Sequence, residues 1–210
     1  MLNTFFDNTF LINLDRRSDR LVNAAAQCKR IGLRFERFPA FDGSIEKLDF
    51  VEASLIGQPD YYWNSAAAGL VVSFMRIIET SIDRGYESIL ILEDDVTFRD
   101  DLQQVVGRWL QQVPSDWETL YFGALHLAPF IPVSQHVARI TRSYHTHCWA
   151  LHSRVFKECL EIARQLDNPL DIMVANEIHP RGRSYCFIEN ISFQAAGYSD
   201  IMAREVAPKL

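Results

Sequence analysis

Three adjacent carboxylates, Glu93, Asp94 and Asp95, directly follow an apolar run in the segment SILILEDDVTF, residues 88–98. Like charges this close repel one another, and an ionised carboxylate held away from bulk water costs free energy unless something positive compensates it. A metal ion and a cluster of basic side chains are the usual compensators. The residue types therefore raise the question of what neutralises this point of the chain.

An extended backbone through the three acids would turn Glu93 and Asp95 to one side and Asp94 to the other. An acid-x-acid pair on one face suits a hard divalent cation, because such a cation takes oxygen ligands and keeps positions open for water and phosphate. A solvated turn, or a cap for a helix that begins near Asp101, explains the three acids equally well.

Three arginines lie close together earlier in the chain, in the segment INLDRRSDRL. Arg16, Arg17 and Arg20 stand beside an expected helix start, where backbone N–H groups and guanidinium forks both favour an anionic or nucleotide ligand. The alternative is a set of surface arginines that pair with Asp15 and Asp19, an arrangement that contributes little to stability.

Apolar segments with strand spacing alternate with segments of helical spacing along the chain. Strands are predicted at 9–14, 33–38, 88–92, 119–123 and 185–194, and helices at 18–31, 69–82, 101–113 and 153–166. Ser18 and Asp100 are expected to cap the starts of two of these helices, and Gly32 to end the first. The first 38 residues thus form a β-α-β unit, which predicts parallel pairing and a right-handed crossover.

The whole chain, residues 1–210, reads as one α/β domain with a mostly parallel central sheet, because no repeat, linker or low-complexity segment interrupts it. Ligands of such open sheets gather outside the carboxyl ends of the strands. Three polar segments follow predicted strands in this way: 13–20, 39–43 and 93–95. We expect them to line one site.

Composition narrows the class of protein. The chain is 48% hydrophobic and 23% charged, with a net charge of −6, which argues against nucleic acid as a partner. Its four cysteines, which are far apart, are expected to be reduced core thiols (Cys28, Cys148, Cys159 and Cys186). No apolar run approaches the roughly 20 residues of a membrane span, and we see no secretion signal. We expect a cytoplasmic protein, with a membrane-attached substrate at the inner face of the membrane as an option.

Three sequence blocks, LINLDRRSDRL, GLRFERFPAFDG and LILEDDVTF, resemble glycosyltransferase family 25 in their order and spacing. That family includes lipooligosaccharide and collagen galactosyltransferases. The blocks HCWALHSRVFKECL, PLDIMV and QAAGYSDI extend the resemblance over nearly the whole chain. One block departs from the pattern: GLVVSF keeps Gly69 and Ser73 but has Leu70 and Phe74 where members usually carry Cys and His.

The resemblance implies a GT-A type fold whose Rossmann-like half holds a UDP-sugar donor. It further implies Mn²⁺ or Mg²⁺ on the donor diphosphate, with Asp95 as the first choice of ligand and Glu93 as the second. His147, which alternates with His145, could complete the metal sphere, or else be a packed, hydrogen-bonded histidine. The implied donor-binding residues are Asn13, Leu14, Arg16, Arg20, Asp42, Ser73, Asp94 and Gln194.

An inverting mechanism, as the resemblance implies, needs a general base for the acceptor hydroxyl. Asp171 in PLDIMV is the candidate, with Glu177 as a rival and a helix-capping role as the alternative for Asp171. Asp200, in the same block as Gln194, is expected near the acceptor or donor edge, or else in a C-terminal turn.

The expected reaction is transfer of a hexose, by analogy galactose, to a saccharide acceptor that can be lipid-linked, as in surface glycan or lipopolysaccharide biosynthesis. Residues 44–65 and 126–145 are the expected acceptor loops. The aromatic group Tyr61, Tyr62 and Trp63 would stack on sugar or uracil, or pin its loop to the core. Two alternatives stay open: a binding protein of the same fold with little catalysis, and a glycoside hydrolase. The hydrolase fits poorly, because it needs carboxylates about 5–9 Å apart across a bond.

Overall fold

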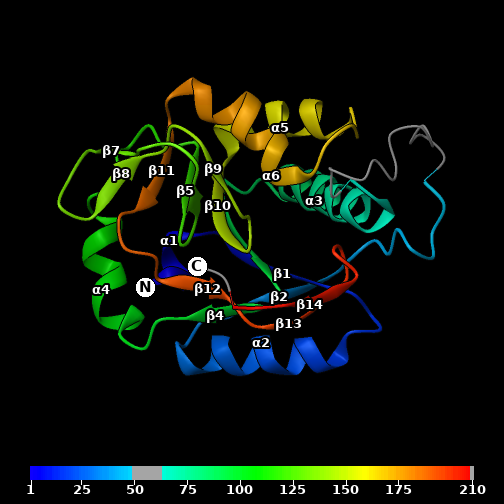
Figure 1. Ribbon diagram of the computed structural model, residues 1–210. Coiled ribbons are helices and arrows are strands. Elements are labelled where there is room, and N and C mark those ends of the chain that lie inside the picture. Colours follow the sequence, from blue (N-terminus) through cyan, green and yellow to red (C-terminus); the bar gives the residue numbers. More distant parts are fainter. Residues whose placement is uncertain (49–62, 209–210) are drawn as a thin grey trace.

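A single eight-stranded sheet forms the centre of the computed structural model, which describes residues 1–48 and 63–208 (Figure 1). Its strands lie in the order β2 (Glu36–Pro39), β1 (Asn8–Asn13), β3 (Ser88–Glu93), β10 (Cys148–His152), β5 (Thr119–Tyr121), β11 (Ser184–Phe187), β8 (Val137–Arg139) and β7 (Ile131–Pro132). All of these strands except β10 and β8 run in the same direction. The sheet is therefore mostly parallel, as predicted, and β1 pairs with β2 in the expected β-α-β unit.

Three two-stranded sheets complete the strands: β4 (Val96–Phe98) with β12 (Ser192–Gln194), β6 (Leu125–His126) with β9 (Ser143–Tyr144), and β13 (Gly197–Ser199) with β14 (Arg204–Val206). The α-helices are α1 (Leu2–Phe5), α2 (Ser18–Arg30), α3 (Ser65–Asp83), α4 (Leu102–Leu110), α5 (Phe156–Ala163) and α6 (Leu170–Met173). A π-helical turn at 174–178 follows α6, and 3-10 turns occupy 153–155 and 179–181.

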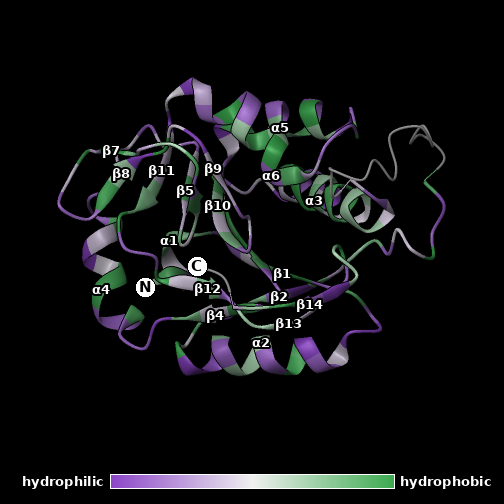
Figure 2. Ribbon diagram, viewed as in Figure 1, coloured by the Kyte–Doolittle hydropathy of each residue, from purple (hydrophilic) through white to green (hydrophobic). Residues whose placement is uncertain are grey.

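The two faces of the sheet each bury a hydrophobic core, because successive strand residues point to opposite sides. Phe10 and Ile91 face the core formed with α3, α5 and α6, whereas Leu11 and Leu92 face the core formed with α1, α2 and α4. Figure 2 shows helices with both hydrophobic and hydrophilic residues around the more hydrophobic strands. Each helix thus covers the sheet with one apolar stripe.

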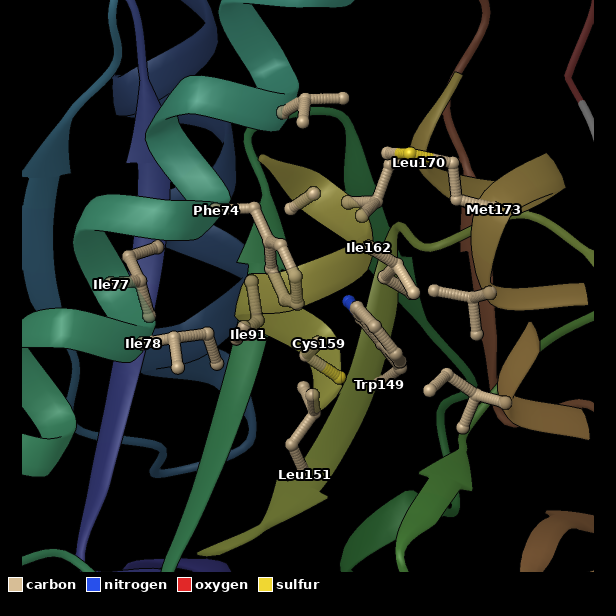
Figure 3. Close-up of a cluster of buried hydrophobic side chains, with 14 of the residues drawn as sticks. Phe74, Ile77, Ile78, Ile91, Trp149, Leu151, Cys159, Ile162, Leu170 and Met173 are labelled. Carbon is tan, nitrogen blue, oxygen red and sulfur yellow. The ribbon is translucent and has the colours of Figure 1, made fainter. Parts of the chain in front are cut away.

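The helix α3 is long and apolar enough to cross a membrane by length and composition, but 56% of that stretch is buried inside the fold. Its Phe74 is fully buried and stacks on Trp149 of β10, with ring centroids 5.5 Å apart (Figure 3). The two residues that depart from the family pattern therefore lie in different environments. Phe74 is a core residue, and Leu70 is only partly buried. The apolar character of α3 serves the core of this fold.

The start of α3 lies against the loop that follows β2. Asn64 caps the helix by accepting a hydrogen bond from the Ala67 amide at 2.9 Å. A Cβ at Gly69 would lie 2.6 Å from the Phe41 carbonyl oxygen and 2.9 Å from the Gly43 nitrogen. The close approach of two backbones explains why a glycine stands in the middle of a helix.

Several predicted boundaries need correction. The helix predicted at 69–82 begins at Ser65, and the strand predicted at 185–194 is two strands, β11 and β12, in different sheets. Neither predicted cap is used: Ser18 is already inside α2, and Asp100 pairs with Arg30 instead of capping α4. Strand β10 was not predicted, because a short apolar run such as CWALH fits a helix and a strand alike.

Other expectations hold. Gly32 follows α2 with a positive φ of 62°, and the next amide, of Leu33, bonds back to the Cys28 carbonyl at 2.9 Å. All four cysteines are free and buried. Trp63 is buried in the core, as the pinning alternative required, while Tyr61 and Tyr62 lie outside the described residues.

Substituting Gly69→Ala should lower the free energy of unfolding by about 2 kcal/mol, because the new methyl group would overlap rigid backbone atoms. Gly107→Ala in α4 is the matched control: its Cβ would meet only the flexible side chain of Met1, and alanine favours helix by about 1 kcal/mol. Urea denaturation measures both variants. Equal effects of the two substitutions would contradict the close contact between α3 and the loop.

Candidate active site

The three acids lie where β3 ends, at the carboxyl edge of the parallel strands. Strand β3 stops at Glu93, and Asp94 and Asp95 form a tight turn that leads into β4. The backbone is therefore not extended through the acids, so the predicted alternation of faces is wrong in detail. The turn instead brings all three carboxylates to one place between the ends of β3, β1 and the start of α2.

Arg20 on α2 joins two of these carboxylates. Its Nε lies 2.8 Å from Asp94 Oδ1, and its Nη2 lies 2.8 Å from Asp95 Oδ2. Asp94 is only 8% exposed, and its second oxygen accepts a hydrogen bond from Asn13 Nδ2 at 2.7 Å. Because Asn13 ends β1 and Arg20 lies one turn into α2, the first β-α unit holds the turn from two sides.

Asn13 uses its whole side chain for such contacts. Its Nδ2 also donates to the Arg17 carbonyl at 2.9 Å, and its Oδ1 accepts from Arg37 Nε at 3.0 Å. Leu14 contributes its carbonyl to the Arg17 amide at 2.9 Å. Asn13 and Leu14, which were predicted to bind the UDP-sugar, therefore shape the loop after β1 by these hydrogen bonds. Arg37 was missed, because nothing in the sequence marks which face of β2 it occupies.

Arg16 and Arg17 point toward the same region from the loop before α2. Arg16 pairs with Asp42 after β2, its Nε lying 2.7 Å from Asp42 Oδ2. Both arginines also reach Asp200, which lies on the C-terminal turn. Ion pairs thus join the segments 13–20, 39–43 and 93–95, and Asp200 joins them from 184 residues away.

The negative charge of the three acids in the turn is only partly compensated by nearby positive groups. Burial, and then the negative charge of Asp95, raises the pKa of Glu93 to about 8. Burial also raises the pKa of both Asp94 and Asp95, and the Arg20 charge offsets only part of that rise. The Glu93 side chain is held by a neutral group, the Thr146 hydroxyl, which donates to its Oε1 at 3.0 Å. An added cation would stabilise this arrangement.

Two buried oxygen atoms in the described part of the chain point to the same conclusion. Asp95 Oδ1 and Gln194 Oε1 have no hydrogen-bond partner among the described residues. Gln194 lies beside Asp95, since its Nε2 is 3.4 Å from Asp95 Oδ2. Carboxylate and amide oxygens without donors are ligands that Mg²⁺ or Mn²⁺ takes, so Glu93, Asp95 and Gln194 fit a hard divalent ion.

His147 has one ring nitrogen in a hydrogen bond and one without. It is fully buried, its Nε2 lies 3.1 Å from the Ser192 hydroxyl, and burial lowers its pKa to about 4. Its Nδ1 is buried without a hydrogen-bond partner among the described residues. Within residues 1–48 and 63–208, no three or more His, Cys, Asp or Glu side chains gather to hold a metal ion. His147 as a third ligand therefore stays a prediction, beside the alternative of a packed histidine. A site with one or two carboxylates remains open, because Mg²⁺ often completes its sphere with water and phosphate.

Ser73 is also a structural residue. It is fully buried in α3, donates to the Gly69 carbonyl at 2.7 Å and accepts from the Phe41 amide at 2.8 Å. It therefore positions the loop that carries Asp42, and the loop rather than Ser73 reaches the site. The buried environment that causes this is not readable from a serine in a helical segment.

The candidate base, Asp171, is half-buried in the first turn of α6 and makes no capping bond there. Its Oδ1 accepts from the Ile172 amide at 2.9 Å, and its Oδ2 accepts from the His145 amide at 3.4 Å. The next residue, Thr146, holds Glu93. Because consecutive Cα atoms are about 3.8 Å apart, this short segment links Asp171 to the acidic turn. The rival Glu177 is exposed on the π-helical turn that follows.

A cavity of about 600 Å³ opens beside the turn, between α2 and the strands β13 and β14. Its lining includes Arg17, Arg20, Asp95, Gln194 and Tyr198. Its size and its mixed lining are those of a small-ligand site. The two unpartnered oxygens belong to residues of this lining.

Comparison with known proteins identifies the family. The model of "Glycosyltransferase family 25 (LPS biosynthesis protein)" matches residues 6–165. The chain belongs to glycosyltransferase family 25. The sequence resemblance seen in the three blocks around the site is thereby confirmed, and the family covers the arginines, the acidic turn and α5.

The relatives that the chain matches include animal proteins of this family. It is 33% identical over 131 residues to a glycosyltransferase 25 family member of Drosophila pseudoobscura pseudoobscura and 31% identical over 129 residues to procollagen galactosyltransferase 1 of Danio rerio. It is also 27% identical over 136 residues to the inactive glycosyltransferase 25 family member 3 of Mus musculus. These matches cover 56–59% of the chain and 21–23% of the relatives. The chain thus matches little more than a fifth of each relative's length.

Among solved structures, the fold is similar to a glycosyltransferase involved in the glycosylation of the major capsid of PBCV-1. The TM-score is 0.50 at 12% identity, over 83% of this chain and 76% of that chain. The α/β fold of GT-A type, expected from the resemblance, is confirmed. The chain thus belongs to a glycosyltransferase family and has the fold expected for it.

Removing Arg20 should destabilise the metal-free protein strongly, because Asp94 and Asp95 would keep buried charges without a partner. Arg20→Met should lower the free energy of unfolding by about 3 kcal/mol. Arg84→Met, which breaks an exposed pair with Glu36, should cost below about 1 kcal/mol. Urea denaturation in the presence of a chelator compares the two; similar losses would contradict the role given to Arg20.

The raised pKa of Glu93 predicts a pH dependence of stability. A carboxyl whose folded pKa is raised contributes stability below its ordinary pKa and loses it as the pH rises toward about 8. Between pH 6 and pH 8.5, metal-free wild type should therefore lose about 2 kcal/mol relative to Glu93→Gln. Urea denaturation of both proteins at the two pH values measures this difference. Parallel pH profiles would show that Glu93 keeps its ordinary pKa in the folded protein.

Proposed function

We propose that the protein transfers a hexose from a UDP-sugar to a saccharide acceptor in a metal-dependent, inverting reaction. The observation that carries this proposal is the acidic turn, where Arg20 joins Asp94 to Asp95 while two buried oxygens lack donors. A site that already holds more carboxylate than positive charge is suited to a divalent cation, and a cation in turn suits a diphosphate.

Mn²⁺ or Mg²⁺, when bound, would stabilise the negative charge that grows on the diphosphate as the bond from the anomeric carbon to phosphate breaks. Glu93, Asp95 and Gln194 are the residues that would hold the ion. Arg16 and Arg20 would add charge-assisted hydrogen bonds to the phosphate oxygens. Asp42, held by Arg16 at the end of β2, would lie toward the nucleoside.

Asp171 is the proposed general base. In an inverting transfer the acceptor oxygen attacks the anomeric carbon from the face opposite the diphosphate, and its proton passes to a carboxylate. Asp171 could take that proton, because its half-buried carboxylate accepts hydrogen bonds from two backbone amides and from no arginine or lysine among the described residues. The contacts of the His145 amide with Asp171 and of the Thr146 hydroxyl with Glu93 support a base close to the proposed donor site.

The name of the Danio rerio relative, a procollagen galactosyltransferase, supports galactose as the transferred sugar. We propose a saccharide acceptor, which can be lipid-linked, of the kind found in surface glycan or lipopolysaccharide biosynthesis. The name of the family, which includes LPS biosynthesis, supports this acceptor class. Action in the cytoplasm, at the inner face of the membrane, belongs to the same proposal.

A protein that binds the nucleotide-sugar with little catalysis is the second candidate. The family contains a relative named inactive, and buried Phe74 stands where the family pattern has a histidine. Binding alone would survive loss of Asp171, whereas transfer would not. A substitution of Asp171 therefore distinguishes the two candidate functions, whereas a substitution in the acidic turn would affect both.

Release of nucleoside diphosphate from a panel of nucleotide-sugars, with and without Mn²⁺, tests the function. Wild type should release it from one donor only with Mn²⁺, and Asp95→Asn should reduce the rate at least about a hundredfold, since a ligand of the ion is lost. Asp100→Asn, whose carboxylate is fully exposed, should keep the rate. Donor binding without release would support the binding protein, and a metal-independent rate equal in Asp95→Asn would contradict the metal site.

Asp171→Asn should lower the transfer rate by about 10²–10⁴-fold with unchanged donor affinity, because a base acts on the acceptor and not on the donor. Glu177→Gln is the control and should keep the rate, since its carboxylate is exposed on the neighbouring turn. Initial rates with a saccharide acceptor measure both. A loss in Glu177→Gln instead of Asp171→Asn would reverse the assignment.

A further inference from the structure

The three arginines of the site share one carboxylate, that of Asp200. Arg16 Nη1 lies 2.5 Å from Asp200 Oδ1, Arg17 Nη1 contacts Oδ2, and Arg20 Nη1 lies 3.6 Å from Oδ2. The Asp200 side chain is only 11% exposed. Three guanidinium groups around two carboxylate oxygens form an anion-binding site that the chain fills with its own side chain.

Asp200 reaches this site on a small element outside the central sheet, and its neighbour Ile201 is partly buried against the core. It lies in the loop between β13 and β14, a two-stranded sheet whose strands pair only with each other. The Asn64 side chain donates to the Ile201 carbonyl at 2.6 Å, and the Ser199 hydroxyl accepts from the Met202 amide at 3.2 Å. An isolated two-stranded hairpin is only marginally stable, so such an element is among the first to open.

The other carboxylates near the arginines either belong to more firmly held segments or are exposed and interact more weakly with the arginines. Asp94 and Asp95 form the turn at the end of buried β3, and Asp42 also binds Ser44. Asp19 is 65% exposed and contacts only Arg17 among the arginines. Asp200 is therefore the anion that can leave without disturbing the central sheet.

A donor diphosphate needs the same guanidinium groups. With Asp200 in place, five carboxylates already surround the three arginines, so a diphosphate entering the site would add repulsion. Phosphate oxygens can take the bidentate arginine contacts that a carboxylate makes. Exchange of one anion for the other keeps the arginines paired throughout.

We propose that Asp200 is an internal stand-in for the donor diphosphate, and that donor binding displaces it and the β13–β14 hairpin from Arg16, Arg17 and Arg20. The inference rests on the proposed function, because it assigns the displaced position to the donor of that reaction. Donor affinity then reports the free energy of two steps, release of Asp200 and binding of the diphosphate.

Titration calorimetry with pyrophosphate and with UDP, both in the presence of Mn²⁺, tests the displacement. Asp200→Asn keeps the shape of the side chain but removes the competing charge, so both ligands should bind about tenfold more tightly than to wild type. Asp19→Asn is the matched control: it removes a carboxylate from the same arginine cluster, but an exposed one, and should leave the affinities unchanged.

Hydrogen exchange of wild type supplies a second measurement that depends on no variant. Amides of residues 197–206 should exchange faster when pyrophosphate and Mn²⁺ are bound, since the hairpin loses its attachment through Asp200. Amides of β3 serve as the internal reference, because that strand is buried in the sheet and should keep its protection.

The outcomes separate the inference from the proposed function. Weaker binding by Asp200→Asn, or protection of 197–206 on binding, would make Asp200 a residue that positions the arginines and would overturn the displacement. Unchanged affinity with intact Mn²⁺-dependent donor hydrolysis would overturn it as well, while the proposed function stands. Absence of pyrophosphate binding, UDP binding and donor hydrolysis in every protein would overturn both.

Discussion

The contact of Arg20 with Asp94 and Asp95 is the interaction on which the site depends. It joins the start of α2 to the turn after β3. The end of β1 at Asn13 and the end of β3 at Glu93, 80 residues apart in the chain, are thereby held together. The contact alone does not balance the charge of the turn, because Glu93 remains buried beside Asp95 with a raised pKa. The excess of carboxylate makes the turn a place for a cation, and the arginines around it make the same place attractive to a diphosphate.

The fold explains how so much charge can be tolerated in one place. The strands β1 and β3 are buried on both faces by separate hydrophobic cores, which anchor the turn and the arginine loop rigidly. The close contact of Gly69 with Phe41 and Gly43 fixes the third loop in the same way. Rigid supports let the site keep like charges close together, whereas the hairpin that carries Asp200 lies outside the central sheet and pairs only with itself.

Sequence reasoning went furthest where a pattern is local. The apolar run of β1, the helical spacing of α2 and the alternation of residues 33–38 predicted a parallel β-α-β unit, and the polar residues after β1, β2 and β3 predicted a shared edge. It could not predict side-chain surroundings: His147 and Ser73 are common polar residues whose full burial comes from distant strands and loops. Asp200 was placed near the site only by its block, because no spacing rule connects it to arginines 184 residues away. Strand β10 escaped since a short buried run fits helix and strand alike.

A crystal structure grown with Mn²⁺ and UDP, with anomalous scattering recorded at the manganese edge, tests the central claim most directly. The account predicts a manganese peak within coordination distance of Asp95 and next to Gln194, with the diphosphate between the ion and Arg16. A manganese ion or a UDP diphosphate bound away from the Glu93–Asp95 turn, with Asp95 Oδ1 still lacking a partner, would contradict it.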